Sequence, residues 1–320
     1  MLVTRIGMCD RLTMTAIDAL LDGPRAQRAF LLKAVFAGAW AIGVEDEAPL
    51  SVVVVARGRT AFTGDDGVAH DLGPGDAVLA RGPAPYSFAD RAGRPVGIRV
   101  LPGQVCVDPE GQVLPDEMLT GVRTWGNTRE HDRDDATVLL IGTYEHATSV
   151  GALLLSRLPP SAVLHGFDPV LTALLATELE GADAGQSVVL DRLLDLVLVK
   201  AVRTLLADGP ALPADAAVAR TLAAIEAHPE LPWTVASLGA HVGLSRAALA
   251  RRFGRSVGEP PLTYLTRWRL ALAADLLAGT DLPLAAVAGR VGYASPFALS
   301  AAFKRAHGVA PATYRLGLAG

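Results

Sequence analysis

The stretch GLSRAALARRFGRSVG, residues 243–258, decides the fold of the second half of this chain, because its pattern recurs in GYASPFALSAAFKRAHG, residues 292–308. A fixed internal period indicates a supersecondary unit that is present twice. One residue is inserted in the second turn, so the spacing is forty-nine before it and fifty after it. The matched pairs are Leu238 and Val287, Val242 and Val291, Gly243 and Gly292, Ser245 and Ser295, Leu249 and Leu299, Phe253 and Phe303, Gly258 and Gly308, Pro261 and Pro311, and Tyr264 and Tyr314.

The first copy has the pattern of two short helices joined by a tight turn. Thr234 is placed to cap a helix over 235–242, and Gly243 supplies the left-handed residue that ends it. Ser245 then caps a second helix that runs to about Gly254. This spacing predicts a helix-turn-helix.

The second copy repeats the pattern with helices over 282–291 and 295–308. Pro296 stands at the first position of its second helix, where the missing N–H has no structural cost. The sequence therefore predicts two helix-turn-helix units in the last hundred residues.

The second helix of the first copy has a basic exposed face. Leu249 and Phe253 lie four apart and turn inward, which leaves arginine and alanine outside. A solvated face would mix glutamates among the arginines, and none occurs between residues 244 and 258. Arginine reads guanine in the major groove and alanine contacts the thymine methyl, so the pattern favours DNA over solvent. The outward residues are Arg246, Ala247, Ala250 and Arg251, with Arg252 and Arg255 extending the basic flank.

Charge is divided unevenly along the 320 residues, a length that suits two domains. Residues 216–320 hold 11 Lys and Arg against 5 Asp and Glu, whereas the rest holds 18 against 28. A basic module joined to an acidic one is typical of nucleic-acid binding with a separate control domain. No uncharged apolar run reaches the ~18 residues of a membrane span, so we expect a soluble cytoplasmic protein without membrane contact.

The first half reads as short strands and then as helices. Runs at 51–58, 60–64, 76–82, 96–103 and 138–145 are rich in β-forming residues and separated by Gly, Pro and Asp. They predict an antiparallel barrel or double-sheet roll. The charged stretch 127–137 is expected to be a surface loop, with a carboxylate–histidine metal site as the less favoured alternative.

Helical periodicity begins after residue 169. Residues 170–179 and 186–207 are expected to be helices, and residues 208–215 a linker. The longer helix is apolar on most sides and must be buried on more than one. It either covers the barrel and meets a second subunit or lies wholly within its own domain.

Residues 216–316 resemble the DNA-binding domain of AraC/XylS-type transcription regulators. The resemblance implies seven helices, with a linker helix at about 261–278 between two units that enter successive major grooves. It implies base reading by Ala247, Ala250 and Arg251, and by Phe297, Ser300 and Ala301. Contacts to the DNA backbone are implied for Ser245, Arg246, Lys304 and Arg305, and Arg255 and Ser295 are further candidate DNA-binding residues. Ala301 stands where some members carry arginine, so we expect Arg251 to provide most direct readout and the second unit to add anchoring and shape recognition.

The strands around residues 72–88 resemble the cupin-type sensing domain of such regulators, and a small-molecule effector pocket inside the barrel is implied. The metal-binding His-x-His pattern of cupin enzymes is missing, so we expect neither a metal, a cofactor nor a catalytic site. The candidate pocket residues are Trp40, Tyr86, Phe88 and Arg99.

Two cysteines, Cys9 and Cys106, are too few for a disulfide framework or a four-thiolate zinc site. Some regulators with a cupin-like domain sense oxidants through cysteine, which makes this pair a redox candidate. Inert thiols are the favoured alternative, because no basic cluster accompanies either residue in the sequence.

The fold class expected is α+β: a cupin-like antiparallel barrel over 1–160, a helical dimerisation segment and linker over 161–215, and an all-α double helix-turn-helix domain over 216–320. The function expected is a sequence-specific regulator of transcription that couples a small-molecule or oxidant signal to double-stranded DNA. Its partners would be a second copy of itself and, for an activator, RNA polymerase. The alternatives are a weakly specific architectural DNA-binding protein and a cupin-fold enzyme with a DNA-targeting tail.

Overall fold

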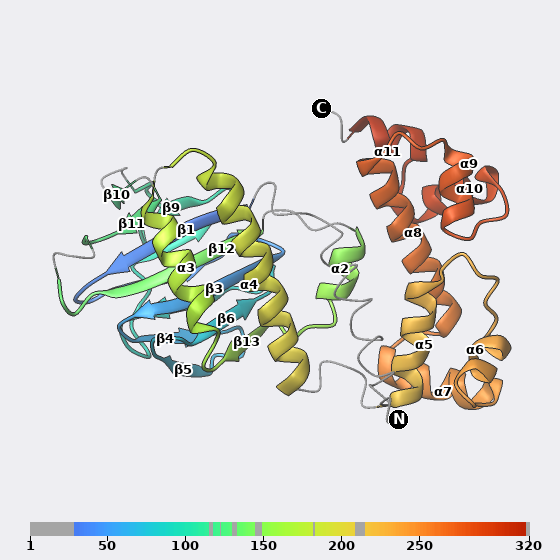
Figure 1. Cartoon of the computed structure of the whole chain (residues 1–320), viewed down its shortest axis with the longest axis horizontal. Helices are drawn as coiled ribbons and strands as arrows, with labels where there is room; N and C mark the ends of the chain where they lie inside the picture. The colour runs from blue at the N-terminus through green and yellow to red at the C-terminus, as the bar shows by residue number, and fades with distance from the viewer. Residues whose placement is uncertain are drawn as a thin grey trace, which may run out of the picture. The chain divides into compact units, whose positions relative to one another are not determined.

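Figure 1 shows the protein as a computed structural model, which describes residues 29–114, 118–121, 123–129, 133–144, 149–181, 183–208 and 215–317. The described residues form two compact units. One unit contains residues 29–144 and 155–208, and the other contains residues 149–154 and 215–317.

The first unit is built on two β-sheets. A seven-stranded sheet has the strand order β10-β11-β1-β12-β3-β6-β13, and a six-stranded sheet has the order β5-β4-β7-β2-β8-β9. The strands are β1 (Ala29–Phe36), β2 (Ala41–Val44), β3 (Leu50–Arg57), β4 (Thr60–Thr63), β5 (Ala69–Leu72), β6 (Ala77–Ala80), β7 (Tyr86–Ala89), β8 (Ile98–Leu101), β9 (Val105–Val107), β10 (Leu119–Gly121), β11 (Thr124–Gly126), β12 (Thr137–Tyr144) and β13 (Ser161–Leu164).

The sheets hold a common core and stay separate, so the unit is a double-sheet roll, not a closed barrel. Phe36 of β1 and Val53 of β3 come from one sheet and meet Phe62 of β4 and Phe88 of β7 from the other. The roll also departs from the expected antiparallel pattern. β1 pairs in parallel with β11, and β2 pairs in parallel with β8. Parallel neighbours need a long connection, and here the intervening strands supply it.

Two helices cover the outer face of the seven-stranded sheet, as Figure 1 shows. They are α3 (Pro169–Glu180) and α4 (Gln186–Asp208), which confirms the two helices expected from periodicity. Gly142 of β12 leaves room for Leu194 of α4, because a Cβ at residue 142 would lie 2.2 Å from Leu194 Cδ1. The buried Tyr144 hydroxyl donates to the Leu194 carbonyl at 2.9 Å. The buried apolar residues of α4 thus pack against the seven-stranded sheet of the same unit.

The second unit is helical. Between residues 216 and 317 it contains seven helices: α5 (Ala216–Ala227), α6 (Val235–His241), α7 (Arg246–Val257), α8 (Pro261–Gly279), α9 (Leu284–Arg290), α10 (Pro296–His307) and α11 (Pro311–Gly317). The short helix α2 (Ser149–Leu155) also belongs to it: the Ser149 and Val150 amides donate to the Asp275 carboxylate of α8.

The residues that recur in the sequence also make equivalent packing contacts in the two units. Phe253 and Tyr264 make an edge-to-face contact with ring centroids 6.0 Å apart. Phe303 and Tyr314, their partners in the repeat, make the same kind of contact at 5.2 Å. Each pair seals its second helix against the helix that follows, and a left-handed glycine ends that second helix in both copies.

Arg269 of α8 holds the two helix-turn-helix units together. Its guanidinium donates to the carbonyl oxygens of Pro229 and Leu231, both 2.7 Å away, in the loop between α5 and α6. Gly292, in the turn of the second unit, lies against the same groups: a Cβ there would be 2.6 Å from the Pro229 oxygen and 2.7 Å from Arg269 Nη2. Only glycine fits this crossing.

We therefore expect Gly292→Ala to destabilise the helical unit far more than Gly243→Ala. Both residues have positive φ, of 82° and 74°, so alanine introduces about 1 kcal/mol of strain at either position. At Gly243 a Cβ meets nothing within 4 Å, whereas at Gly292 it overlaps a backbone oxygen. Hydrogen exchange of α9 and α10 amides in the full-length chain measures the difference. Equal loss of protection in the two variants would contradict the close contact of Gly292 with the Pro229 oxygen and Arg269.

Candidate nucleic-acid interface and interior pocket

Helix α7 presents a basic surface beside its N-terminus. The Ser245 Oγ accepts the Ala248 N–H at 3.2 Å and so caps the helix. Leu249 and Phe253 are fully buried, as the spacing predicted. The remaining candidate residues of this helix are all exposed: Ser245, Arg246, Ala247, Ala250, Arg251 and Arg255.

Arg252 has a structural partner and leaves the basic flank on which the sequence placed it. Its Nε lies 2.5 Å from Asp215 Oδ2, and Asp215 also accepts the amides of Ala217 and Val218 at the start of α5. Burial alone would raise the pKa of Asp215, but Arg252 and the two amides lower it below its ordinary value. The ion pair fixes α7 to α5.

Helix α10 differs in chemistry from α7. The Ser295 Oγ accepts the Ala298 N–H at 3.2 Å, so this helix is capped in the same way. Phe297 is 85% exposed, the most exposed large apolar side chain among the described residues. Ser300 is half-buried, while Ala301, Lys304 and Arg305 are exposed. The outward face is therefore apolar near its N-terminus and basic in its last turns.

Neither helix carries an acidic side chain, because α7 and α10 contain no Asp or Glu. A row of arginine, lysine and small apolar residues meets both requirements of a DNA contact: cations for phosphates and flat apolar or bidentate groups for base edges.

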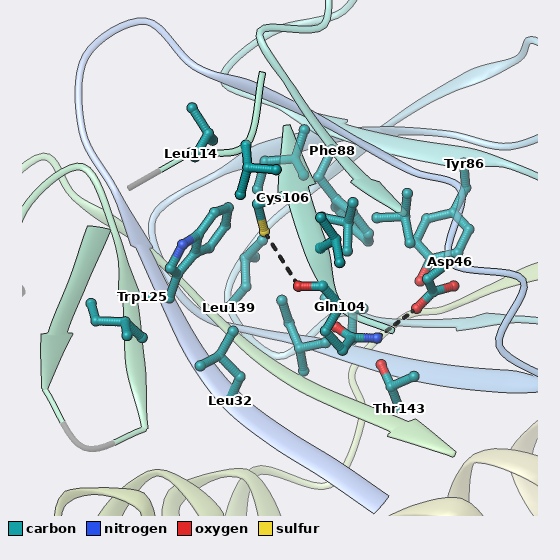
Figure 2. A pocket seen from close by; sticks show the side chains of 18 residues that line it. Leu32, Asp46, Tyr86, Phe88, Gln104, Cys106, Leu114, Trp125, Leu139 and Thr143 are labelled. Atoms are coloured by element: carbon teal, nitrogen blue, oxygen red, sulfur yellow. Dashed lines mark hydrogen bonds between the residues drawn. The ribbon is translucent and has the colours of Figure 1, made fainter. Parts of the chain in front are cut away.

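The first unit contains a pocket of about 350 Å³ between its two sheets (Figure 2). Most of its wall is aliphatic or aromatic, and it is in the size range of sites for one small organic molecule. Residues from both sheets and from the β8–β10 connections line it: Leu32, Ile42, Val44, Asp46, Val53, Tyr86, Phe88, Val100, Gln104, Val105, Cys106, Val113, Leu114, Leu119, Trp125, Leu139, Ile141 and Thr143.

Of the four residues named from sequence for an effector pocket, the structure brings two to this site. Tyr86 and Phe88 line it, and their rings contact each other edge to face at 6.0 Å. Trp40 lies elsewhere in the core, stacked on Phe36 at 4.8 Å. Arg99 is on β8, outside the lining, where its guanidinium binds both carboxylate oxygens of Glu45.

Cys106 also lines the pocket, and its Sγ lies 3.9 Å from the Gln104 carbonyl oxygen. Burial raises the pKa of its thiol, which disfavours the thiolate that oxidants attack. Cys9 lies outside the described residues, so the redox pair stays a prediction.

Sequence reasoning missed the pocket residues Asp46, Gln104, Trp125 and Thr143. Asp46 stands in the run Glu45–Glu47, which by itself indicates a solvated turn. The other three come from segments far apart in the chain, and only the pairing of the sheets brings them to one cavity. Among the described residues, no three His, Cys, Asp or Glu side chains are grouped as metal ligands.

Comparison with known proteins gives matches over both units. A family described as "Cupin" matches residues 16–207, and a family described as "Helix-turn-helix domain" matches residues 238–317. In the part of the chain that is described, none of the helices has the length and hydropathy needed to cross a membrane.

A putative AraC-like transcription regulator of Streptomyces antibioticus is 33% identical over 88% of this chain and 91% of its own length. The HTH-type transcriptional regulator AlkR of Acinetobacter baylyi is 28% identical over 94% of this chain and 99% of its own. Among solved structures, the C-terminal domain of AraT from Geobacillus stearothermophilus is 34% identical over 32% of this chain and 86% of its own, with a TM-score of 0.32. The repeated helix-turn-helix, the cupin match and these full-length relatives agree: this chain belongs to the AraC-like transcription regulators, with a cupin domain at its N-terminal side and a helix-turn-helix domain at its C-terminal side.

Proposed function

We propose that this regulator reads promoter DNA with α7 and α10 and responds to a small molecule held in the pocket between its sheets. The observation that carries the proposal is the acid-free outward surface of both helices, presented twice by one repeated unit. The length of α8 supports it: 19 residues at 1.5 Å each span about 28 Å, comparable with the ~34 Å turn that separates successive major grooves.

The two helices have different tasks in this proposal. Arg251 is exposed, and its guanidinium suits bidentate reading of guanine, with Ala247 and Ala250 against thymine methyls. Arg246 and Arg255 bind phosphates on one side of it. In α10, Lys304 and Arg305 anchor the backbone while Phe297 and Ala301 supply apolar contacts.

The exposed apolar residues of α3 and α4 support a homodimer. They lie on the two helices that cover the seven-stranded sheet, and large apolar side chains gathered on an exposed surface are typical of interaction sites. The residues are Val170, Leu174, Val188, Val189 and Leu196. We place the protein in the cytoplasm with its promoter, and contact with RNA polymerase follows if it activates transcription.

Fluorescence anisotropy of the full-length protein tests the proposal on DNA from upstream of its own gene. A scrambled duplex of equal composition runs beside it across a salt series. A preference of about a thousandfold, with a steep salt slope on both duplexes, is expected of a specific regulator. Equal binding to this duplex, to duplexes selected from a random pool and to the scrambled duplex identifies a non-specific architectural protein instead.

Arg251→Ala is expected to cost about 1–3 kcal/mol on the selected site and little on the scrambled duplex, because it removes a base contact. Arg252→Lys is the matched control on the same helix, since a lysine keeps the positive charge that pairs with Asp215 and fixes α7 to α5. It is expected to leave the preference between the duplexes unchanged. Equal weakening on both duplexes by Arg251→Ala would assign Arg251 to a phosphate.

Phe297 is expected to contact thymine methyl groups. Replacing thymine by uracil in the half-site under α10 removes only those methyls and should weaken binding about threefold to tenfold, as an apolar contact of ~1 kcal/mol does. In Phe297→Ala the same replacement should have no effect. Uracil in the half-site under α7 gives the internal comparison, and an undiminished uracil effect in Phe297→Ala would disprove the contact.

Leu196→Asp is expected to convert the dimer to a monomer, measured by light scattering at micromolar concentration. Leu196 is 46% exposed on α4, so the aspartate disturbs association and not the core. Leu194 is 2% exposed against Gly142, so a charge there would unfold the unit and could not report on association. Val68→Asp, at a residue 51% exposed away from α3 and α4, is the control that should remain dimeric. A monomeric wild-type protein would refute the interface.

A further inference from the structure

The polar side chains of the pocket gather at one end. In Figure 2, Asp46, Tyr86 and Thr143 lie together on the right, while Leu32, Leu114 and Trp125 line the opposite end. The Thr143 hydroxyl lies 3.2 Å from the hydroxyl of Ser51, so it has a protein partner already. A ligand that fills this pocket therefore has an apolar body and one polar head.

Asp46 is held in place by neutral donors. One oxygen accepts the Ala48 amide at 3.1 Å, and the other accepts the Gln104 side-chain amide at 3.1 Å. A carboxylate has about four lone-pair sites, so both oxygens keep room for a ligand donor. Among the described residues no salt bridge reaches Asp46, and nearby Arg99 is engaged by Glu45 through two hydrogen bonds of 2.9 and 2.7 Å.

The backbone is left-handed at the residue after Asp46 and at its partner Gln104. In the described part of the chain, the non-glycine residues with positive φ are Glu47, at 56°, and Gln104, at 61°. Glu47 directly follows Asp46, and Gln104 is the residue whose side-chain amide donates to Asp46. Such conformations cost of order 1 kcal/mol or more and persist where surrounding structure imposes them, typically at ligand sites. A backbone conformation of higher energy thus accompanies the carboxylate and the amide at the end of the apolar cavity.

The charge of the polar head follows from these contacts. A carboxylate on the ligand would face Asp46 without a cation to offset the repulsion. A polyhydroxylated ligand would leave most of its hydroxyls against aliphatic walls, at a cost for each. A protonated amine satisfies Asp46 with a charge-assisted hydrogen bond, and Tyr86 offers an aromatic ring beside it.

We propose that the pocket binds an organic cation, a protonated amine on an apolar aliphatic or aromatic body, with the ammonium group on Asp46 and Gln104 and the body against Trp125 and Phe88. This deepens the proposed function, because it names the chemical class of its effector. The site also explains why an acidic side chain occurs in an otherwise apolar wall.

Isothermal titration calorimetry on the full-length protein tests the proposal with three probes of nearly equal shape: phenylbutylamine, phenylbutanol and phenylbutyrate. The expected order of affinity is amine, alcohol, carboxylate. Asp46→Asn keeps the shape and removes the charge, so it should weaken the amine by about tenfold or more and the alcohol by less than about threefold. Glu47→Gln is the matched control: its side chain is exposed and does not line the pocket, so the amine affinity should be unchanged.

Alkylation of Cys106 in a Cys9→Ser background gives a second reading. Because Cys106 lines the pocket, saturating amine should slow its reaction with a maleimide. The proposal is overturned if phenylbutyrate binds as tightly as phenylbutylamine, if Asp46→Asn leaves the amine affinity unchanged, or if none of the three probes binds. These outcomes leave specific DNA binding in the anisotropy assay untouched, whereas loss of DNA preference with intact amine binding would refute the proposed function alone.

Discussion

The helical unit depends on one helix, α8, which is buried by a different set of side chains at each end. Tyr264 and Trp268 stack in its first half, and Leu270 and Leu277 enter the core of the second helix-turn-helix in its other half. Between them Arg269 crosses to the loop after α5. A rigid helix with both ends fixed gives α7 and α10 one separation and one relative rotation, and a double major-groove contact requires both.

The two copies of the motif keep the same architecture and carry different chemistry. Their caps, left-handed glycines and aromatic contacts agree because the packing of short helices demands them. The exposed residues of α7 and α10 are not constrained by this packing. One copy therefore shows Arg251 where the other shows Ala301, and Ala247 where the other shows Phe297. These differences cost the fold nothing except an exposed aromatic ring.

In the double-sheet roll, by contrast, packing leaves part of the interior unfilled. Its core is close-packed, with Trp40 stacked on Phe36, but the packing stops short at one end and leaves a cavity. Positive φ occurs at Gln104 and at Glu47, which follows Asp46, beside the polar end of that cavity. Strained backbone persists where the surrounding structure imposes it, and such positions cluster at ligand sites.

The sequence by itself determined the helix-turn-helix units, their caps, the linker helix and the residues outside them, because these depend on contacts three and four residues apart and on turns that only glycine favours. It also located five of the strands, which are β3, β4, β6, β8 and β12, and its four candidate pocket residues included Tyr86 and Phe88, which line the cavity. Only the tertiary structure decided that the sheets stay open with parallel pairs, that Arg252 turns to Asp215, and that Asp46 meets Gln104 in a cavity. The contacts of Arg252 and Asp46 join residues 37 and 58 positions apart, and no local periodicity encodes a partner at that distance.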